Sequence, residues 1–163
     1  MSWMVLILGL VPGLGDDPDL QAELARHQGT WEVVSFLREG NEAPKEIAAA
    51  ITRVVEGDHV VWYRDGKPFA GTTVVLDPSR TPKAIDVIPD GGPQRGKAVL
   101  GIYRLDGDEL TICMAAPDAP RPKTFSADKG TGQTLMTFRR AQGSSRSRRP
   151  RNSTGEPSDS RHK

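Results

Sequence analysis

The fold is decided by the stretch GTWEVVSFL, which spans residues 29–37. Its side chains alternate with a period of two, which predicts a β-strand over Thr30–Leu37 with one buried face. One face would carry Trp31, Val33, Ser35 and Leu37, and the other Glu32, Val34 and Phe36. This strand is the first of a series, because similar short segments follow it along the chain.

Seven further segments show strand character and are separated by turn residues, at residues 51–56, 59–64, 69–76, 84–88, 97–105, 109–115 and 133–140. Asp65-Gly66 is the strongest hairpin signal, and Asp106-Gly107-Asp108 is a second tight hairpin. Short connections imply antiparallel neighbours. We therefore predict an all-β fold, an antiparallel up-and-down barrel of about eight strands that is lipocalin-like in kind. A two-sheet β-sandwich with the same strand count is the alternative.

Two short helices are predicted beside these strands. Asp16 to Gln28 has Asp17 as a candidate N-cap and Pro18 at the first helical position, where a missing N–H has no cost. Leu20 and Leu24 form a narrow apolar stripe, so this helix should lie on something larger. Residues 44–50 are predicted to form one or two helical turns.

The two ends of the chain differ in composition from its middle. Residues 142–163 contain no large apolar side chain and carry six basic and two acidic residues, which predicts a disordered basic tail. Because the whole chain has net charge +1 and the tail contributes +4, residues 1–141 carry −3. An acidic body argues against nucleic-acid binding by the folded domain. The tail itself is predicted to be solvated, with contact to nucleic acid or another anionic surface as the alternative.

The first 15 residues resemble a secretory leader. Residues 3–11 are apolar apart from Gly9, and Gly13-Leu14-Gly15 supplies small residues for a cleavage site, although no Lys or Arg precedes the run. The run is too short to span a bilayer as a helix, so no transmembrane span is expected. The predicted organisation is a leader at 1–15, a barrel domain at 16–141 and a tail at 142–163, in a protein that is exported to the periplasm or cell exterior, or otherwise cytoplasmic.

Several motifs occur in one order: GTWEVV at 29–34, LDPS at 76–79, PKAID at 82–86, LGIYRLDGD at 100–108, Cys113, and Arg121-Pro122 with Phe125. Together they resemble an uncharacterised lipocalin-like domain family of planctomycete bacteria, over roughly residues 20–140. The structural signature of the lipocalin and fatty-acid-binding superfamily is resembled by four residues: Gly29, Trp31, Arg139 and Arg140. That resemblance implies that an arginine of the last strand stacks on Trp31 at the closed end of the barrel. Arg139 is the first choice and Arg140 the second.

No residue pattern indicates catalysis or a metal site. The single cysteine, Cys113, is predicted to be a small half-buried residue on a strand. His27 and His59 lack the spacing of zinc ligands and are predicted to lie on the surface. No Gly-x-Ser-x-Gly elbow is present. We therefore expect no enzyme activity, no catalytic residues, no metal and no cofactor, and the resemblance supplies none because the family has no established activity.

Four residues are candidates for ligand binding. Asp86 lies on a predicted strand, where it faces outward or, if inward, anchors a ligand or pairs with an internal arginine. Arg121 and Phe125 belong to a rigid basic loop that could meet an anionic ligand or simply close the core. Tyr103 is grouped with them as one of the few aromatic side chains. Two functions follow: a barrel that binds a small apolar or anionic molecule, or a module with a filled core that contacts another protein.

Overall fold

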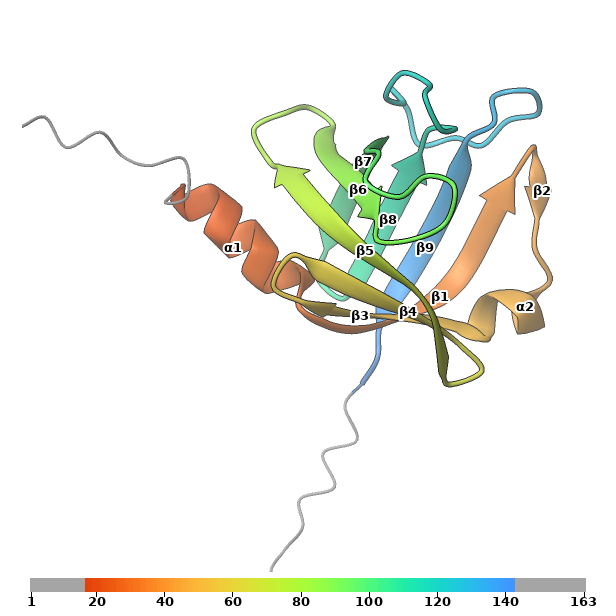
Figure 1. The fold of residues 1–163 in the computed structure, drawn as a ribbon, viewed down its shortest axis with the longest axis horizontal. Coiled ribbons are helices and arrows are strands. Elements are labelled where there is room, and N and C mark those ends of the chain that lie inside the picture. The colour runs from red at the N-terminus through yellow and green to blue at the C-terminus, as the bar shows by residue number, and fades with distance from the viewer. Residues whose placement is uncertain (1–16, 143–163) are drawn as a thin grey trace, which may run out of the picture.

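The structure is a computed structural model that describes residues 17–142, as nine strands and two helices (Figure 1). The helices are α1 (Pro18–His27) and α2 (Lys45–Ala49). The strands are β1 (Gly29–Arg38), β2 (Asn41–Glu42), β3 (Ile51–Glu56), β4 (His59–Arg64), β5 (Lys67–Asp77), β6 (Lys83–Pro89), β7 (Val99–Asp106), β8 (Glu109–Met114) and β9 (Thr134–Arg140). The predicted leader and most of the predicted tail lie outside the described residues. Neither helix within 17–142 has the length and apolar character needed to cross a membrane.

Eight of the strands form one closed antiparallel barrel. Neighbouring strands pair in chain order from β3 to β9, and β1 pairs with β3 on one side and with β9 on the other. The β1–β9 pairing runs from Trp31 opposite Arg140 to Arg38 opposite Thr134, which closes the sheet on itself. The barrel prediction is therefore confirmed, and the two-sheet sandwich is excluded. The two-residue strand β2 pairs only with β1 and lies outside the barrel.

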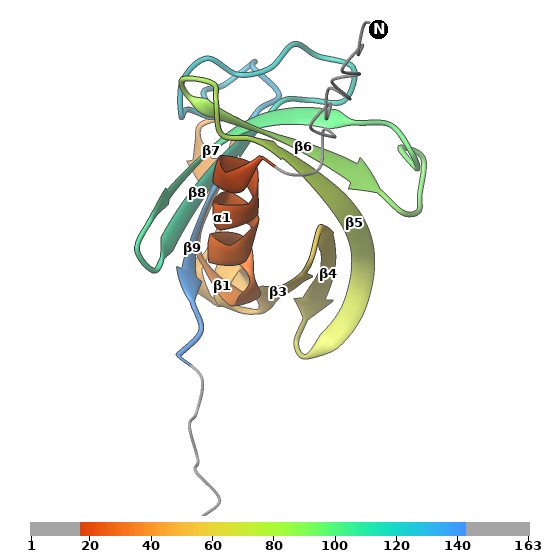
Figure 2. The ribbon, with the colours of Figure 1, turned by 90° about the vertical axis from the view of Figure 1, so that its left-hand side faces the viewer.

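The hairpins form where turn residues interrupt the alternation. Asp65 and Gly66 both have positive φ, 50° and 74°, as a two-residue type I′ turn between β4 and β5 requires. At the start of α1, the Asp17 side chain accepts a hydrogen bond from the Asp19 amide at 2.9 Å, which confirms the predicted cap. Figure 2 shows α1 lying across one end of the barrel, with the strands curving around it.

The predicted faces of β1 are correct only up to Val33. The pairing with β9 shifts register between Val33 and Ser35, as a β-bulge does. Beyond the bulge, Phe36 packs on the core, although it was predicted to face away from Trp31. Ser35 instead donates from its hydroxyl to Glu42 of β2 at 3.0 Å. The extra residue at the bulge exchanges the inward and outward faces of β1 beyond it, because side chains on a strand repeat every two residues.

The barrel interior is filled mainly by apolar side chains from every strand of the barrel. The largest side chains that are less than 2% exposed include Trp31, Arg53, Tyr103, Phe138, Ile85 and Leu110. All but one of these are apolar or aromatic, and the exception is the guanidinium of Arg53. An arginine in such surroundings is unusual, because a buried charge costs several kcal/mol unless it is paired.

A long connection between β8 and β9, residues 115–133, packs on the outside of the sheet. It covers Cys113, which is fully buried rather than half-buried as predicted, and whose thiol lies 3.2 Å from the Ser126 carbonyl oxygen. Burial raises the pKa of the Cys113 thiol, so it is not a reactive thiolate. Arg121 holds the connection against β7 by donating a hydrogen bond to the Gly101 carbonyl oxygen at 2.6 Å.

Candidate functional site: the barrel interior around Arg53

The closed end of the barrel is built on Trp31, which is fully buried. The guanidinium carbon of Arg140 lies 4.1 Å from the centre of the Trp31 ring, so Arg140 makes the predicted stack. The first choice, Arg139, was wrong, because Phe138 points into the core and Arg140, two residues on, shares its face. Gly29 has φ of 101°, a backbone conformation that favours glycine, and the Arg140 side chain lies directly beside it.

The same end holds a buried carboxylate that the sequence analysis missed. Glu23 of α1 is 6% exposed and points into the barrel. It accepts a hydrogen bond from the Tyr103 hydroxyl at 3.1 Å and pairs with Lys83 and with Arg26. Burial alone would raise the pKa of Glu23, but the hydrogen bonds from Lys83 and Tyr103 outweigh it and lower that pKa. Burial and the nearby carboxylate raise the pKa of Tyr103, so its hydroxyl stays protonated and donates.

His27 was predicted to lie on the surface, and the structure shows it fully buried. Its Nδ1 lies 2.9 Å from the Glu23 carbonyl oxygen, and its ring meets the Tyr103 ring edge-on at 4.9 Å. Burial lowers the pKa of His27 to about 4, so the imidazole is neutral at pH 7. His27 lies four residues after Glu23 and four residues before Trp31, which places it at the corner between α1 and β1. His59 is exposed, as predicted, and its Nε2 lies 2.8 Å from Asp90.

The four predicted ligand residues divide between the inside and the outside of the barrel wall, although Tyr103, Arg121 and Phe125 all line two neighbouring grooves. Asp86 and Arg121 come together on the outside of the sheet, with Arg121 Nη1 2.6 Å from Asp86 Oδ1. Asp86 therefore faces outward and pairs with an arginine of the outer connection. Tyr103 points inward to Glu23, and Phe125 lies on the outside under Arg104, whose guanidinium carbon is 5.4 Å from the ring centre.

The most unusual side chain of the interior is Arg53 on β3, which is 1% exposed. It faces inward between Trp31 of β1 and Trp62 of β4. Its guanidinium carbon lies 5.0 Å from the Phe138 ring centre and 5.8 Å from that of Trp62. Burial lowers the pKa of Arg53 to about 9, which still leaves the group charged at pH 7. Within residues 17–142, no carboxylate pairs with it.

Two N–H groups of Arg53 have no hydrogen-bond partner among the described residues, namely those of Nε and Nη2. These two nitrogens form one edge of the planar guanidinium and donate in parallel, which matches the two oxygens of a carboxylate or of a phosphate. Contacts with the aromatic rings offset only part of the missing hydration. The interior thus presents a desolvated cation whose Nε–Nη2 edge has no hydrogen-bond partner among residues 17–142.

A hollow lies beside β5 and the connection that follows β6. It has a volume of about 610 Å³, and its wall includes Phe69, Ala70, Thr72, Pro89 and the carboxylate of Asp90. The Trp62 indole donates to the Thr72 hydroxyl at 3.2 Å, so Trp62 contacts both the wall of the hollow and the Arg53 guanidinium.

Sequence reasoning missed Arg53, although a signal was present. Residues 51–56 alternate, and Arg53 shares its face with Ile51 and Val55, both of which are buried. An arginine in the inward set of a strand is a candidate for a buried role. Its partners could not be inferred, because they come from β1, β4 and β9.

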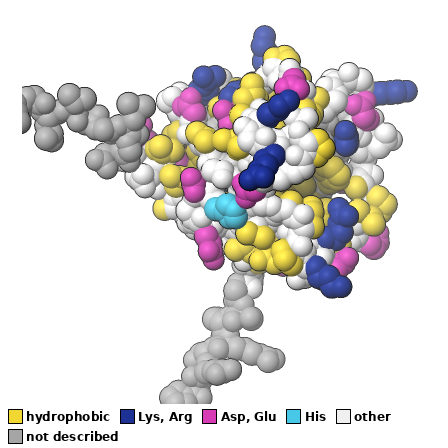
Figure 3. Space-filling view, viewed as in Figure 1, with side chains coloured by type: hydrophobic (Ala, Val, Ile, Leu, Met, Phe, Trp, Pro, Cys, Tyr) yellow, Lys and Arg dark blue, Asp and Glu magenta, His cyan; other side chains and the backbone are white. Residues whose placement is uncertain are grey.

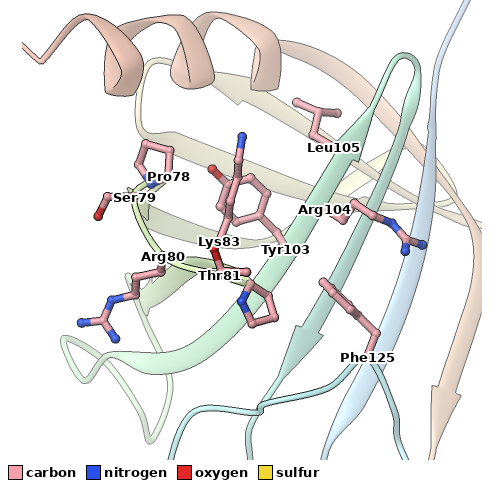
Figure 4. Close-up of a pocket in the computed structure, with 10 residues that line it drawn as sticks. Pro78, Ser79, Arg80, Thr81, Lys83, Tyr103, Arg104, Leu105 and Phe125 are labelled. Atoms are coloured by element: carbon pink, nitrogen blue, oxygen red, sulfur yellow. The ribbon is translucent and has the colours of Figure 1, made fainter.

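Two grooves form a second hollowed region, where residues 78–83 lie against β7 and the connection between β8 and β9. The first, of about 480 Å³, is drawn in Figure 4, where Lys83 and Tyr103 lie near the centre, Arg80 on one side, and Arg104 and Phe125 on the other. The second, of about 560 Å³, shares Arg80, Thr81 and Pro82 with the first and extends to Arg121 and Lys123. We call them the paired grooves.

Within the described residues, no three His, Cys, Asp or Glu side chains are grouped so that they could hold a metal ion. Comparisons with protein-family models, curated proteins and solved structures found no match for the chain. The assignment of the candidate site therefore rests on the geometry of the described residues.

Proposed function

We propose that the barrel binds a small molecule with one anionic group, held by Arg53, and that it does so without catalysing a reaction. The observation that carries the proposal is the unpartnered Nε–Nη2 edge of a guanidinium that is 1% exposed. An isolated buried charge is strongly unfavourable, whereas a bound carboxylate would supply two charge-assisted hydrogen bonds. The apolar part of the hollow beside Thr72, formed by Phe69, Ala70 and Pro89, suits the uncharged remainder of the ligand, and the Asp90 carboxylate in the same wall is paired with His59.

The resemblance to the lipocalin-like family agrees with this proposal and stays a prediction. The same holds for export, which the apolar run at residues 3–11 suggests. N-terminal sequencing of protein from its native host would test export, since a chain that still begins at Met1 in the cytoplasm contradicts it.

The test compares two probes that differ only in charge. Decanoate and 1-decanol have the same chain length, and binding is followed by tryptophan fluorescence, because Trp62 lies over Arg53. We expect saturable binding of decanoate and at least tenfold weaker binding of decanol. Arg53→Gln should abolish that preference, whereas Arg139→Gln, which removes an exposed arginine, should leave it unchanged. Equal binding of both probes by the unmodified chain would overturn the assignment of Arg53.

A stability measurement separates a binding role from a structural one. If Arg53 serves to bind a ligand, Arg53→Met should raise the free energy of unfolding measured without ligand by about 1–4 kcal/mol, because an apolar side chain replaces an unpaired buried charge. If the guanidinium instead holds the barrel together, Arg53→Met will be destabilising. Native mass spectrometry of protein from its own cells would show whether an organic acid is bound.

A further inference from the structure

The paired grooves carry an unusual charge distribution. Residues 17–142 contain 18 acidic and 16 basic side chains, so the domain is net negative. Over the face seen in Figure 3, Lys and Arg side chains are interspersed with Asp and Glu. The paired grooves differ, because among residues 17–142 five cations line them and no carboxylate does. These cations are Arg80, Lys83, Arg104, Arg121 and Lys123.

Three of the five cations have ion pairs whose acidic partners lie outside the lining. Arg80 pairs with Asp77 at 2.8 Å, Lys83 with Glu23, and Arg121 with Asp86. Arg104 is exposed and rests on the Phe125 ring, and Lys123 is exposed and makes no ion pair with any residue in 17–142. The paired grooves are therefore electropositive, because the charges of Arg104 and Lys123 are not neutralised by an ion pair within residues 17–142.

The rest of the lining combines apolar and hydroxyl side chains. The half-buried Phe125 ring provides accessible apolar surface, whereas Leu105 and Ile102 are buried and Ser79 and Thr81 are exposed. Pro78, Pro82 and Pro122 form parts of the walls. Proline restricts the backbone, so little conformational entropy is lost when a partner binds. Cations that lie with Phe125 and prolines in two joined grooves complement an extended segment that combines acidic and apolar side chains.

We propose that the paired grooves bind an extended acidic segment of another protein. A nucleic acid fits less well, because the net negative domain repels a long polyanion and Phe125 lies beneath Arg104 rather than open for base stacking. This surface is separate from the interior site, so a molecule held by Arg53 is not required for it.

The experiment measures fluorescence anisotropy of a labelled peptide of about twelve residues that alternates Glu with Val. We expect saturable binding that weakens as salt rises, because the contacts are exposed charges. The same peptide with Gln in place of Glu should bind at least tenfold more weakly. Lys123→Glu should weaken binding of the Glu peptide about tenfold.

Two controls make the result specific. Lys129→Glu makes the same charge change on the same connection but away from the grooves, and should leave binding unchanged. Arg53→Met should also leave it unchanged, which separates this proposal from the interior site. No saturable binding up to millimolar peptide, equal loss from Lys123→Glu and Lys129→Glu, or tighter binding of a single-stranded oligothymidylate of similar length would each overturn the proposal.

Discussion

Because His27 is buried, the stability of the barrel should fall as the pH is lowered from neutral to mildly acidic. The imidazole is fully buried against Tyr103, and its pKa is lowered from 6.5 to about 4. The unfolded chain therefore takes up a proton near pH 6.5, whereas the folded chain resists protonation until about pH 4. Because the unfolded state binds more protons in this window, stability is lost as pH falls.

The size of the effect follows from the two pKa values. A shift of one unit corresponds to about 1.4 kcal/mol, so the full effect approaches about 3 kcal/mol. Between about pH 7 and about pH 5, the two titration curves give a loss of about 2 kcal/mol. Glu23 and Asp77, whose pKa values are lowered from values already below 5, act mainly at more acidic pH.

The assay is urea denaturation at about pH 7 and about pH 5, for the unmodified chain, His27→Gln and His59→Gln. His27→Gln removes the titrating group, so its stability should change little between the two pH values, even if it is lower throughout. His59→Gln removes an exposed histidine and should keep the pH dependence of the parent. If His27→Gln loses as much stability as the parent on acidification, the argument from burial is refuted.

Three further substitutions test the packing of the barrel, each by urea denaturation at neutral pH. Trp31→Ala should cost about 3–5 kcal/mol, because it removes a fully buried indole, and an unchanged midpoint would contradict its place at the closed end. Arg140→Ala should cost about 2 kcal/mol through the lost ring stack and backbone hydrogen bonds, whereas Arg139→Ala should be nearly neutral; equal costs would contradict the observed stack. Gly101→Ala should cost about 1–3 kcal/mol, since its Cβ would lie 2.9 Å from a carbonyl oxygen of β8, and the control Gly91→Ala, with open space around it, should change nothing.

Local features of the sequence were sufficient for the secondary structure. The eight barrel strands, the Asp65-Gly66 hairpin and the Asp17 cap were all predicted, because each depends on side-chain period or turn preference over a few residues. Strand ends differed by a few residues, as between the predicted 97–105 and the observed Val99–Asp106. The short connections also predicted antiparallel pairing in chain order.

The candidate site could be predicted only in part. Trp31 at the closed end and an arginine from the last strand followed from the resemblance, but Arg139 was chosen over Arg140. The alternation of β9 gives two faces without saying which one is interior. The basic loop with Arg121 and Phe125, which lines part of the paired grooves, was anticipated as a ligand contact. Arg53 and Glu23 were not anticipated as functional features, because each depends on side chains that come from strands or helices far apart in sequence.

The sequence by itself determined which segments become strands, where they turn and how α1 begins, since these are short-range properties of the chain. The tertiary structure alone decided that β1 pairs with β9, which makes a barrel rather than a sandwich. It also decided that His27 is buried and that no carboxylate in the described part of the chain pairs with Arg53. Burial and pairing depend on which distant side chains meet once the sheet closes, and neither is encoded in the period of any one segment.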